Sequence, residues 1–126
     1  MNILLFAAFA LGLTSCLSTS PDTCQSTALT PVLSATGPKT IAVNQPATFT
    51  LSYEIQNGCG TFAGLQEQAN TDTRLVGVNI KYDGCNCPQT VTPAQTTYTF
   101  QPTTAGTYYV RFVGSTGYLI DTLVAK

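Results

Sequence analysis

Residues 47–55 read Ala-Thr-Phe-Thr-Leu-Ser-Tyr-Glu-Ile, and this stretch decides the fold class. Apolar and polar side chains alternate along its length, with Phe49, Leu51 and Tyr53 on one side and threonine or serine on the other. A period of two places successive side chains on opposite faces of a β-sheet. Pro46 precedes the stretch, and Asn57-Gly58, a strong turn signal, follows it. We therefore predict a strand with one face in the core.

Similar short patterns follow along the chain, separated by residues that favour turns. We predict further strands at residues 28–34, 40–43, 75–82, 97–101, 107–113 and 118–125. About seven short strands with turns between them predict an all-β fold, a two-sheet sandwich of antiparallel strands over residues 24–126. The segment from Gly60 to Thr73 has no clear period, and it is either a weak edge-strand crossover or a binding loop.

The seven residues Thr104-Ala105-Gly106-Thr107-Tyr108-Tyr109-Val110 lead into one of these strands. They resemble the tyrosine-corner segment of immunoglobulin-like domains, in which Tyr108 would be the corner tyrosine and Gly106 the glycine two residues before it. The resemblance implies an immunoglobulin-like β-sandwich in which the hydroxyl of Tyr108 bonds to the backbone a few residues upstream. Two positions depart from the pattern, because Thr104 replaces an acidic residue and Val110 replaces the second core cysteine.

The composition excludes several classes of function. The 126 residues carry 5 lysines and arginines against 6 aspartates and glutamates, and no histidine, so the formal net charge is −1. Nucleic-acid binding needs clustered basic charge, which this chain lacks. The commonest general base and metal ligand is missing, and the acidic residues show no spacing that calls for a shared cleft. We expect no enzymatic activity, no catalytic residue and no cofactor.

The first 16 residues are predicted to contain an export signal. An apolar run ends at Leu13-Thr14-Ser15-Cys16, and it is too short to cross a bilayer as a helix. These four residues resemble the lipobox of bacterial lipoproteins. The resemblance implies that residues 1–15 are a signal peptide and that Cys16 becomes the lipidated N-terminus. Residues 16–23 would then be a flexible tether, and Leu17 after the cysteine favours the outer membrane.

The chain also resembles small uncharacterised lipoproteins of Bacteroidota-type bacteria, through Asn57-Gly58-Cys59-Gly60 and Gly84-Cys85-Asn86-Cys87 together with the tyrosine-corner segment. That resemblance implies no known activity.

Four further cysteines remain once Cys16 is lipidated, and an even number in an exported protein favours two disulfides. Cys85 and Cys87 are too close to pair with each other in an extended strand, so each is expected to bond a distant partner. Two pairings stay open. One is Cys59–Cys85 with Cys24–Cys87, and the other exchanges the partners.

Three alternative sites follow from the same residues. A soft-metal site for Cu(I) or Zn²⁺ would use Cys59, Cys85 and Cys87, with Cys24 as a possible fourth ligand, although the spacing is unlike that of structural zinc sites. A carbohydrate-binding module would use Tyr118, which follows Gly117 and is expected at an exposed tip. Oxygen ligands for Ca²⁺ would come from the irregular segment, at Glu67, Asn70 and Asp72.

We therefore predict a lipid-anchored module of the bacterial cell envelope with a non-catalytic binding or structural role. Its partners would be the membrane, reached through the lipid, and an envelope protein or a glycan. The soft-metal protein and the carbohydrate-binding module are the alternatives.

Overall fold

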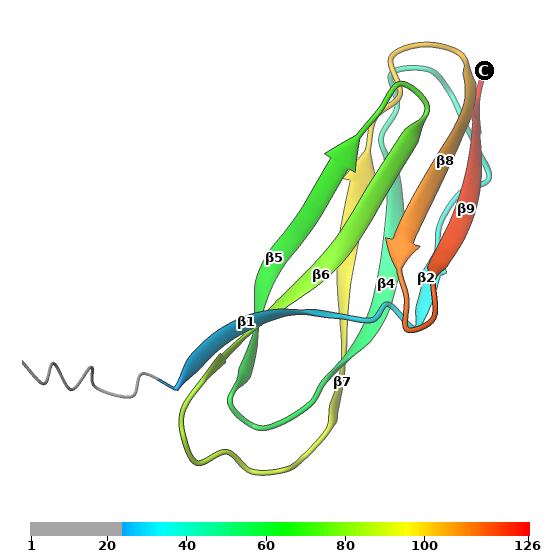
Figure 1. Cartoon of the computed structure of the whole chain (residues 1–126). Helices are drawn as coiled ribbons and strands as arrows, with labels where there is room; N and C mark the ends of the chain where they lie inside the picture. Colours follow the sequence, from blue (N-terminus) through cyan, green and yellow to red (C-terminus); the bar gives the residue numbers. More distant parts are fainter. Residues whose placement is uncertain (1–23) are drawn as a thin grey trace, which may run out of the picture.

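The computed structural model describes residues 24–126, which form nine strands and no helix, packed as two sheets (Figure 1). The strands are β1 (Gln25–Thr30), β2 (Ser34–Thr36), β3 (Thr40–Ile41), β4 (Ala47–Ile55), β5 (Gly60–Ala69), β6 (Thr73–Asp83), β7 (Thr92–Phe100), β8 (Gly106–Val113) and β9 (Tyr118–Ala125). The smaller sheet has the order β2-β4-β7. The larger sheet has the order β1-β6-β8-β9-β3, with β5 on the other edge of β6. Within residues 24–126, no helix is long and apolar enough to cross a membrane.

Strand β6 organises the larger sheet because it is long enough to serve three neighbours. β5 pairs with one edge of β6 from Tyr82 to Arg74. β1 and β8 share the opposite edge, β1 antiparallel from Asp83 to Val78 and β8 parallel from Thr73 to Val76. β1 and β8 therefore lie end to end along this edge, and their ends meet beside the middle of β6.

The predicted all-β sandwich is confirmed, whereas the number and the directions of the strands differ from the expectation. There are nine strands instead of about seven, and two of the pairs, β6 with β8 and β3 with β9, are parallel. β6, the second strand of the β5–β6 hairpin, lies next to β8 and runs in the same direction as β8. Immunoglobulin-like sandwiches consist of two antiparallel sheets, so the hairpin order is a departure from that arrangement.

Two local differences have simple causes. The strand predicted at residues 28–34 is divided by Pro31 into β1 and β2, which belong to different sheets. Proline cannot donate a ladder hydrogen bond, and here the chain crosses from one sheet to the other. The segment from Gly60 to Thr73 is mostly the edge strand β5, whose period is weak because most of its residues are exposed and a bulge lies between Phe62 and Gly64.

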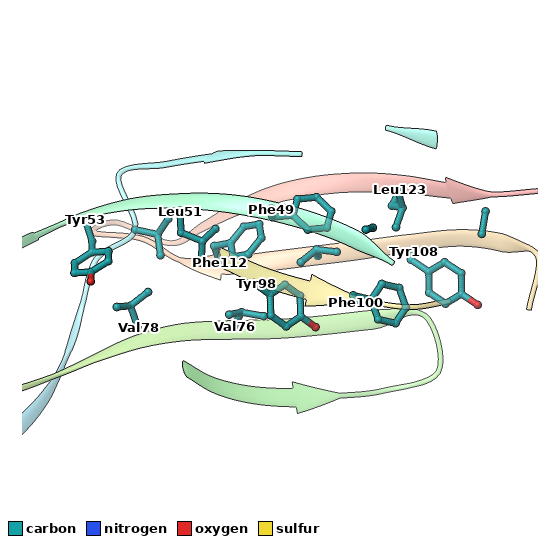
Figure 2. Packing of buried hydrophobic residues seen from close by; sticks show 14 of the residues in the cluster. Phe49, Leu51, Tyr53, Val76, Val78, Tyr98, Phe100, Tyr108, Phe112 and Leu123 are labelled. Carbon is teal, nitrogen blue, oxygen red and sulfur yellow. The ribbon is translucent and has the colours of Figure 1, made fainter. Parts of the chain in front are cut away.

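The core lies between the sheets and contains the apolar faces predicted from the sequence (Figure 2). Phe49 of β4 packs on Phe112 of β8 with ring centroids 5.8 Å apart, and Tyr98 of β7 meets the same Phe112 ring edge-on at 6.2 Å. Val110 and Val76 are fully buried beside them. Val110 stands where antibody domains have their second core cysteine, so an aliphatic side chain fills that place.

The two ends of the sandwich differ in character. The start of β1, the β4–β5 loop and the β6–β7 loop lie at one end, which we call the cystine pole because it holds Cys24, Cys59, Cys85 and Cys87. The C-terminus and the β5–β6 turn lie at the opposite end (Figure 1).

Candidate functional site

The outer face of the larger sheet carries an apolar groove. Its volume is about 260 Å³, and strands β1, β5, β6, β8 and β9 all contribute to its lining. The lining side chains are Leu29, Gln66, Gln68, Leu75, Gly77, Val113 and Tyr118. At slightly less than the roughly 300–1,000 Å³ of drug-sized pockets, the groove has room for a short chain or one ring.

Gly77 forms the floor of this groove because it has no side chain. A Cβ atom at this position would lie 2.6 Å from Cδ2 of Leu29 and 3.6 Å from Cγ2 of Val113. Leu29 therefore covers the glycine from β1, which is the next strand on that edge of β6. Glycine inside a strand often marks a close approach of this kind.

The side chains around Gly77 follow from the register of the strands. Buried Val76 and Val78 face the core, so Leu75, Gly77 and Asn79 face outward. Leu75 is paired with Arg111 of β8, and Val113, two residues further along β8, is paired with Tyr118 of β9. Leu29 and Tyr118 are 49% and 53% exposed. Apolar side chains that cluster on an exposed protein surface often mark a binding site.

Charge on this outer face is almost entirely basic. Arg111 is paired with Leu75, and Lys81 lies further along β6 on the same face. Of the described carboxylates, Asp83 is on this face at the cystine pole beyond Lys81, and Asp72 lies in the turn before β6, where its Oδ1 accepts from the Thr73 hydroxyl. Glu67 faces the space between the sheets, and Asp121 is buried in it. The groove is therefore an apolar surface with a cation beside it and no acid.

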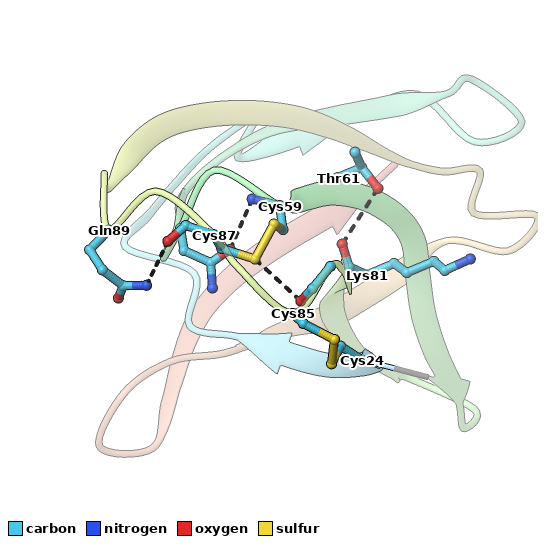
Figure 3. Close-up of a disulfide and its surroundings, with 9 residues drawn as sticks. Cys24, Cys59, Thr61, Lys81, Cys85, Cys87 and Gln89 are labelled. Atoms are coloured by element: carbon cyan, nitrogen blue, oxygen red, sulfur yellow. Dashed lines mark hydrogen bonds between the residues drawn. A yellow bond between two sulfur atoms is a disulfide. The ribbon is translucent and has the colours of Figure 1, made fainter. Parts of the chain in front are cut away.

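The cystine pole contains two disulfides, Cys24–Cys85 and Cys59–Cys87, with Cα–Cα distances of 4.9 and 5.5 Å (Figure 3). This is the second of the two pairings left open by the sequence. The backbone supports both bridges, because the amide of Gly84 donates to the carbonyl of Cys24 at 2.8 Å and Asn57 Oδ1 accepts from the amide of Cys59 at 2.9 Å. The first bridge fixes the start of β1 to the loop after β6.

The same disulfides remove the ligands on which the soft-metal alternative depends. A metal binds the thiolate form of cysteine, and Cys59, Cys85 and Cys87 are all oxidised, as is Cys24. Among residues 24–126 no group of three or more histidine, cysteine, aspartate or glutamate side chains is placed to hold a metal ion. Of the three residues considered for Ca²⁺, Glu67 lies near Tyr98, and Asp72 Oδ1 accepts a hydrogen bond from the Thr73 hydroxyl at 3.1 Å.

Tyr108 lies buried at the start of β8, where its hydroxyl donates to the carbonyl of Thr104 at 2.8 Å. The ring packs on Phe100 with centroids 5.1 Å apart. Gly106, two residues earlier, has φ +151°, in the region that favours glycine. These contacts fix the turn between β7 and β8 at the pole that carries the C-terminus.

Tyr98 illustrates the opposite situation, a buried hydroxyl without a hydrogen-bond partner among the described residues. Burial raises the pKa of Tyr98, and the nearby Glu67 carboxylate raises it further. Arg74 lies on the same side of the core, where its guanidinium carbon is 4.5 Å from the centroid of the Phe100 ring. Burial also raises the pKa of Tyr53.

Lys39 and Asp121 form the ion pair of the described region. Asp121 is on β9 with its side chain 8% exposed, whereas the side chain of Lys39, just before β3, is 74% exposed. Strand β3 runs parallel to β9, and the carbonyl of Lys39 accepts from the amide of Val124 at 2.9 Å. The lysine thus provides the positive charge for a carboxylate that the fold holds between the sheets.

The site residues predicted from sequence are distributed over three places. The four cysteines meet at the cystine pole, Tyr108 and Gly106 lie at the other pole, and Tyr118 lines the groove. Cys16, the signal peptide at residues 1–15 and the tether at residues 16–23 lie outside the described residues.

Six of the seven groove residues were not singled out by the sequence analysis. A signal was available in the glycine at position 77, in the middle of an otherwise apolar strand. A second was the lone leucine, Leu29, of the strand Gln-Ser-Thr-Ala-Leu-Thr. What the sequence lacked was the pairing of β1 with β6, which brings these two residues together.

Comparison with known proteins identifies one relationship. The family model described as the ORF11 beta-sandwich domain matches residues 49–119, more than half of the chain. The matched region runs from β4 into β9 and includes every groove residue except Leu29. No curated protein and no solved structure matches the chain significantly.

Proposed function

The chain belongs to the family of ORF11 beta-sandwich domains, and from that premise we propose that it is a lipid-anchored, non-catalytic binding module of the bacterial cell envelope. The observation that carries the binding role is the groove on the outer face of the larger sheet. It is concave, apolar and exposed, and five strands contribute to it. Ligand sites of proteins typically combine an apolar lining with a few polar groups, which Gln66 and Gln68 supply here.

The anchoring part of the proposal rests on the sequence Leu13-Thr14-Ser15-Cys16 and on the two disulfides. Disulfides persist in exported proteins and are rare in reducing compartments. Cys24, eight residues after Cys16, is fixed to the domain by its bond to Cys85. The eight residue steps from Cys16 to Cys24 span at most about 29 Å when fully extended. A lipid on Cys16 would therefore hold the cystine pole near the membrane and leave the sheet face accessible.

Cell fractionation tests the anchor. Wild-type protein is expected in the detergent-soluble membrane fraction with an increased mass from acyl chains. The Cys16→Ser variant is expected without those chains. A Cys24→Ser, Cys85→Ser variant is the matched control, because it also loses cysteines but keeps Cys16. Membrane-bound Cys16→Ser protein with an unchanged mass would contradict the anchor.

A second candidate is the carbohydrate-binding module, which the position of Tyr118 favours. Its ring is 53% exposed at the groove, and aromatic rings together with the side-chain amides of Gln66 and Gln68 are groups to which sugars bind. We rank it second because the remaining lining is aliphatic and offers few hydrogen bonds to sugar hydroxyls. Binding on a glycan array that is lost in Tyr118→Ala and kept in Tyr109→Ala would favour this candidate.

A further inference from the structure

We propose that the groove binds an apolar chain that ends in a carboxylate, with the hydrocarbon between Leu29, Leu75 and Val113 and the carboxylate at Arg111. This inference deepens the proposed binding role, and it rests on the groove being the ligand site and not on the lipid anchor.

The lining is mostly aliphatic and favours a ligand with few internal polar groups, because Gln66 and Gln68 are its only side-chain amides. Leu29, Leu75 and Val113 present methyl groups, and Gly77 lies beneath Leu29 in a sheet whose hydrogen bonds are already made by β1, β5 and β8. The site lies on a sheet face and not on an edge, so it offers no free ladder of backbone donors and acceptors to a peptide. Gln66 and Gln68 could satisfy only part of the polar groups of a peptide or a sugar, and the groups left unsatisfied would carry a cost that a hydrocarbon chain avoids.

The basic charge of this face favours a ligand with an anionic head group. Arg111 is paired with Leu75 and lies two residues from Val113 on the same face, which corresponds to about 6.6 Å along the strand. Guanidinium and carboxylate form strong, directional hydrogen-bonded pairs. Asp83 lies at the cystine pole beyond Lys81, and Asp72 lies in the turn before β6, where its Oδ1 accepts from the Thr73 hydroxyl, so neither carboxylate lines the groove.

The same charges argue against a second copy as the occupant. Two such faces in contact would bring together two surfaces whose charges near the groove are basic, and like charges across an interface are unfavourable. A free anionic amphiphile brings no like charge to this face, and its hydrocarbon chain has no polar group to leave unsatisfied. The size of the groove limits the bound part to a short stretch of chain.

The test is a titration with four probes of known chemistry: octanoate, octyltrimethylammonium, 1-octanol and octyl glucoside. The protein is used as cells produce it, in lipid nanodiscs if it carries acyl chains and in buffer if it does not. The readout is methyl NMR. Leu29, Leu75 and Val113 report on the groove, and the exposed Leu33 and Val91, which do not line it, report on non-specific contact.

Octanoate is expected to shift the three groove methyl signals and to leave those of Leu33 and Val91 unchanged. Arg111→Gln is expected to weaken octanoate binding by about tenfold and to leave 1-octanol binding unchanged, because only the charged contact is removed. Lys81→Gln, on the same face but further along β6, is the charge-matched control and is expected to have little effect. Gly77→Val is expected to abolish binding of both probes by filling the groove.

Val113→Thr covers the case in which Gly77→Val does not fold, because threonine keeps the shape of valine and makes the wall polar. It is expected to weaken both octanoate and 1-octanol. The proposal is overturned if no probe shifts the groove methyl signals, or if octyltrimethylammonium binds as tightly as octanoate. It is also overturned if Lys81→Gln weakens octanoate and Arg111→Gln does not. Binding of octyl glucoside alone, lost in Tyr118→Ala, would overturn the proposal and support the carbohydrate-binding module instead. None of these outcomes depends on the lipid at Cys16, so each can be interpreted even if the protein is not lipidated.

Discussion

Leu29 of β1 covers Gly77 of β6 so closely that a Cβ atom at position 77 would lie 2.6 Å from the Leu29 Cδ2 atom. We expect Gly77→Ala to fold, because the nearest atom is the end of a flexible side chain, and to cost about 1–2 kcal/mol as the leucine moves aside. The leucine and the alanine are in direct contact, so their effects should not add. In a Leu29→Ala background the cost of Gly77→Ala should largely disappear, as measured by urea denaturation of all four proteins. An equal cost in both backgrounds would place the strain elsewhere.

Two of the buried tyrosines, Tyr108 and Tyr98, predict different effects of the same substitution. Tyr108→Phe removes the hydrogen bond to the Thr104 carbonyl and should destabilise by about 0.5–1.5 kcal/mol. The Tyr98 hydroxyl is buried beside the Glu67 carboxylate but does not meet hydrogen-bond geometry, so Tyr98→Phe should destabilise less than Tyr108→Phe. Thermal denaturation at neutral pH compares the two variants, and an equal loss in both would show that the Tyr98 hydroxyl is as well bonded as that of Tyr108.

The raised pKa of Tyr98 also predicts a dependence on alkaline pH. Burial, followed by the Glu67 carboxylate, raises this pKa above its ordinary value of 10.0. Above pH 10 the unfolded chain loses the phenolic proton while the folded protein keeps it, so stability should fall as pH rises from that point. The fall should be smaller in Tyr98→Phe, and Tyr118→Phe, at an exposed tyrosine, is the control. An identical pH profile in wild type and Tyr98→Phe would contradict this assignment.

The two disulfides should differ in what they hold together, although each contributes about 4 kcal/mol in the chain-entropy account. Cys24–Cys85 closes 61 residues and Cys59–Cys87 closes 28. Five of the six residues of β1 are exposed, so this strand is held mainly by its backbone pairing with β6 and by the Cys24–Cys85 bridge. Hydrogen exchange at residues 25–29 should rise strongly in Cys24→Ser, Cys85→Ser and much less in Cys59→Ser, Cys87→Ser. Equal protection in both variants would show that β1 does not need its disulfide.

The buried carboxylate of Asp121 makes Lys39 more important than its exposure suggests. Lys39→Met leaves the charge of Asp121 without its partner, and we expect a loss of about 1–2 kcal/mol, between the values of exposed and buried pairs. Combining it with Asp121→Leu should recover stability, because an apolar pair replaces the ionic one. Denaturant titration of the two single variants and the double variant measures this, and additive losses would show that the pair is not coupled.

Strands with one dry face could be predicted from the sequence alone. The alternation in residues 47–55 gave the exact bounds of β4, and the strand predicted at residues 75–82 lies within β6. Edge strands were harder to predict, because a strand exposed on both faces has no need for a period of two. This is why Gly60–Ala69 had no clear pattern.

Long-range pairing could not be predicted. Nothing local to β1 indicates that it shares an edge of β6 with β8, and the groove exists only because of that arrangement. The cysteines show the same limit, because their spacing excluded one pairing and left two. The order of strands at the cystine pole selected Cys24–Cys85 and Cys59–Cys87.

The central claim is an anchored, disulfide-linked module, and the intact mass of the protein isolated from the cells that produce it tests this claim most directly. The mass is measured before and after reduction, each time with thiol alkylation. We predict a chain that begins at Cys16 and carries acyl chains, with no thiol alkylated before reduction and four alkylated after it. A chain that retains residues 1–15, or four thiols that react without reduction, would contradict the account.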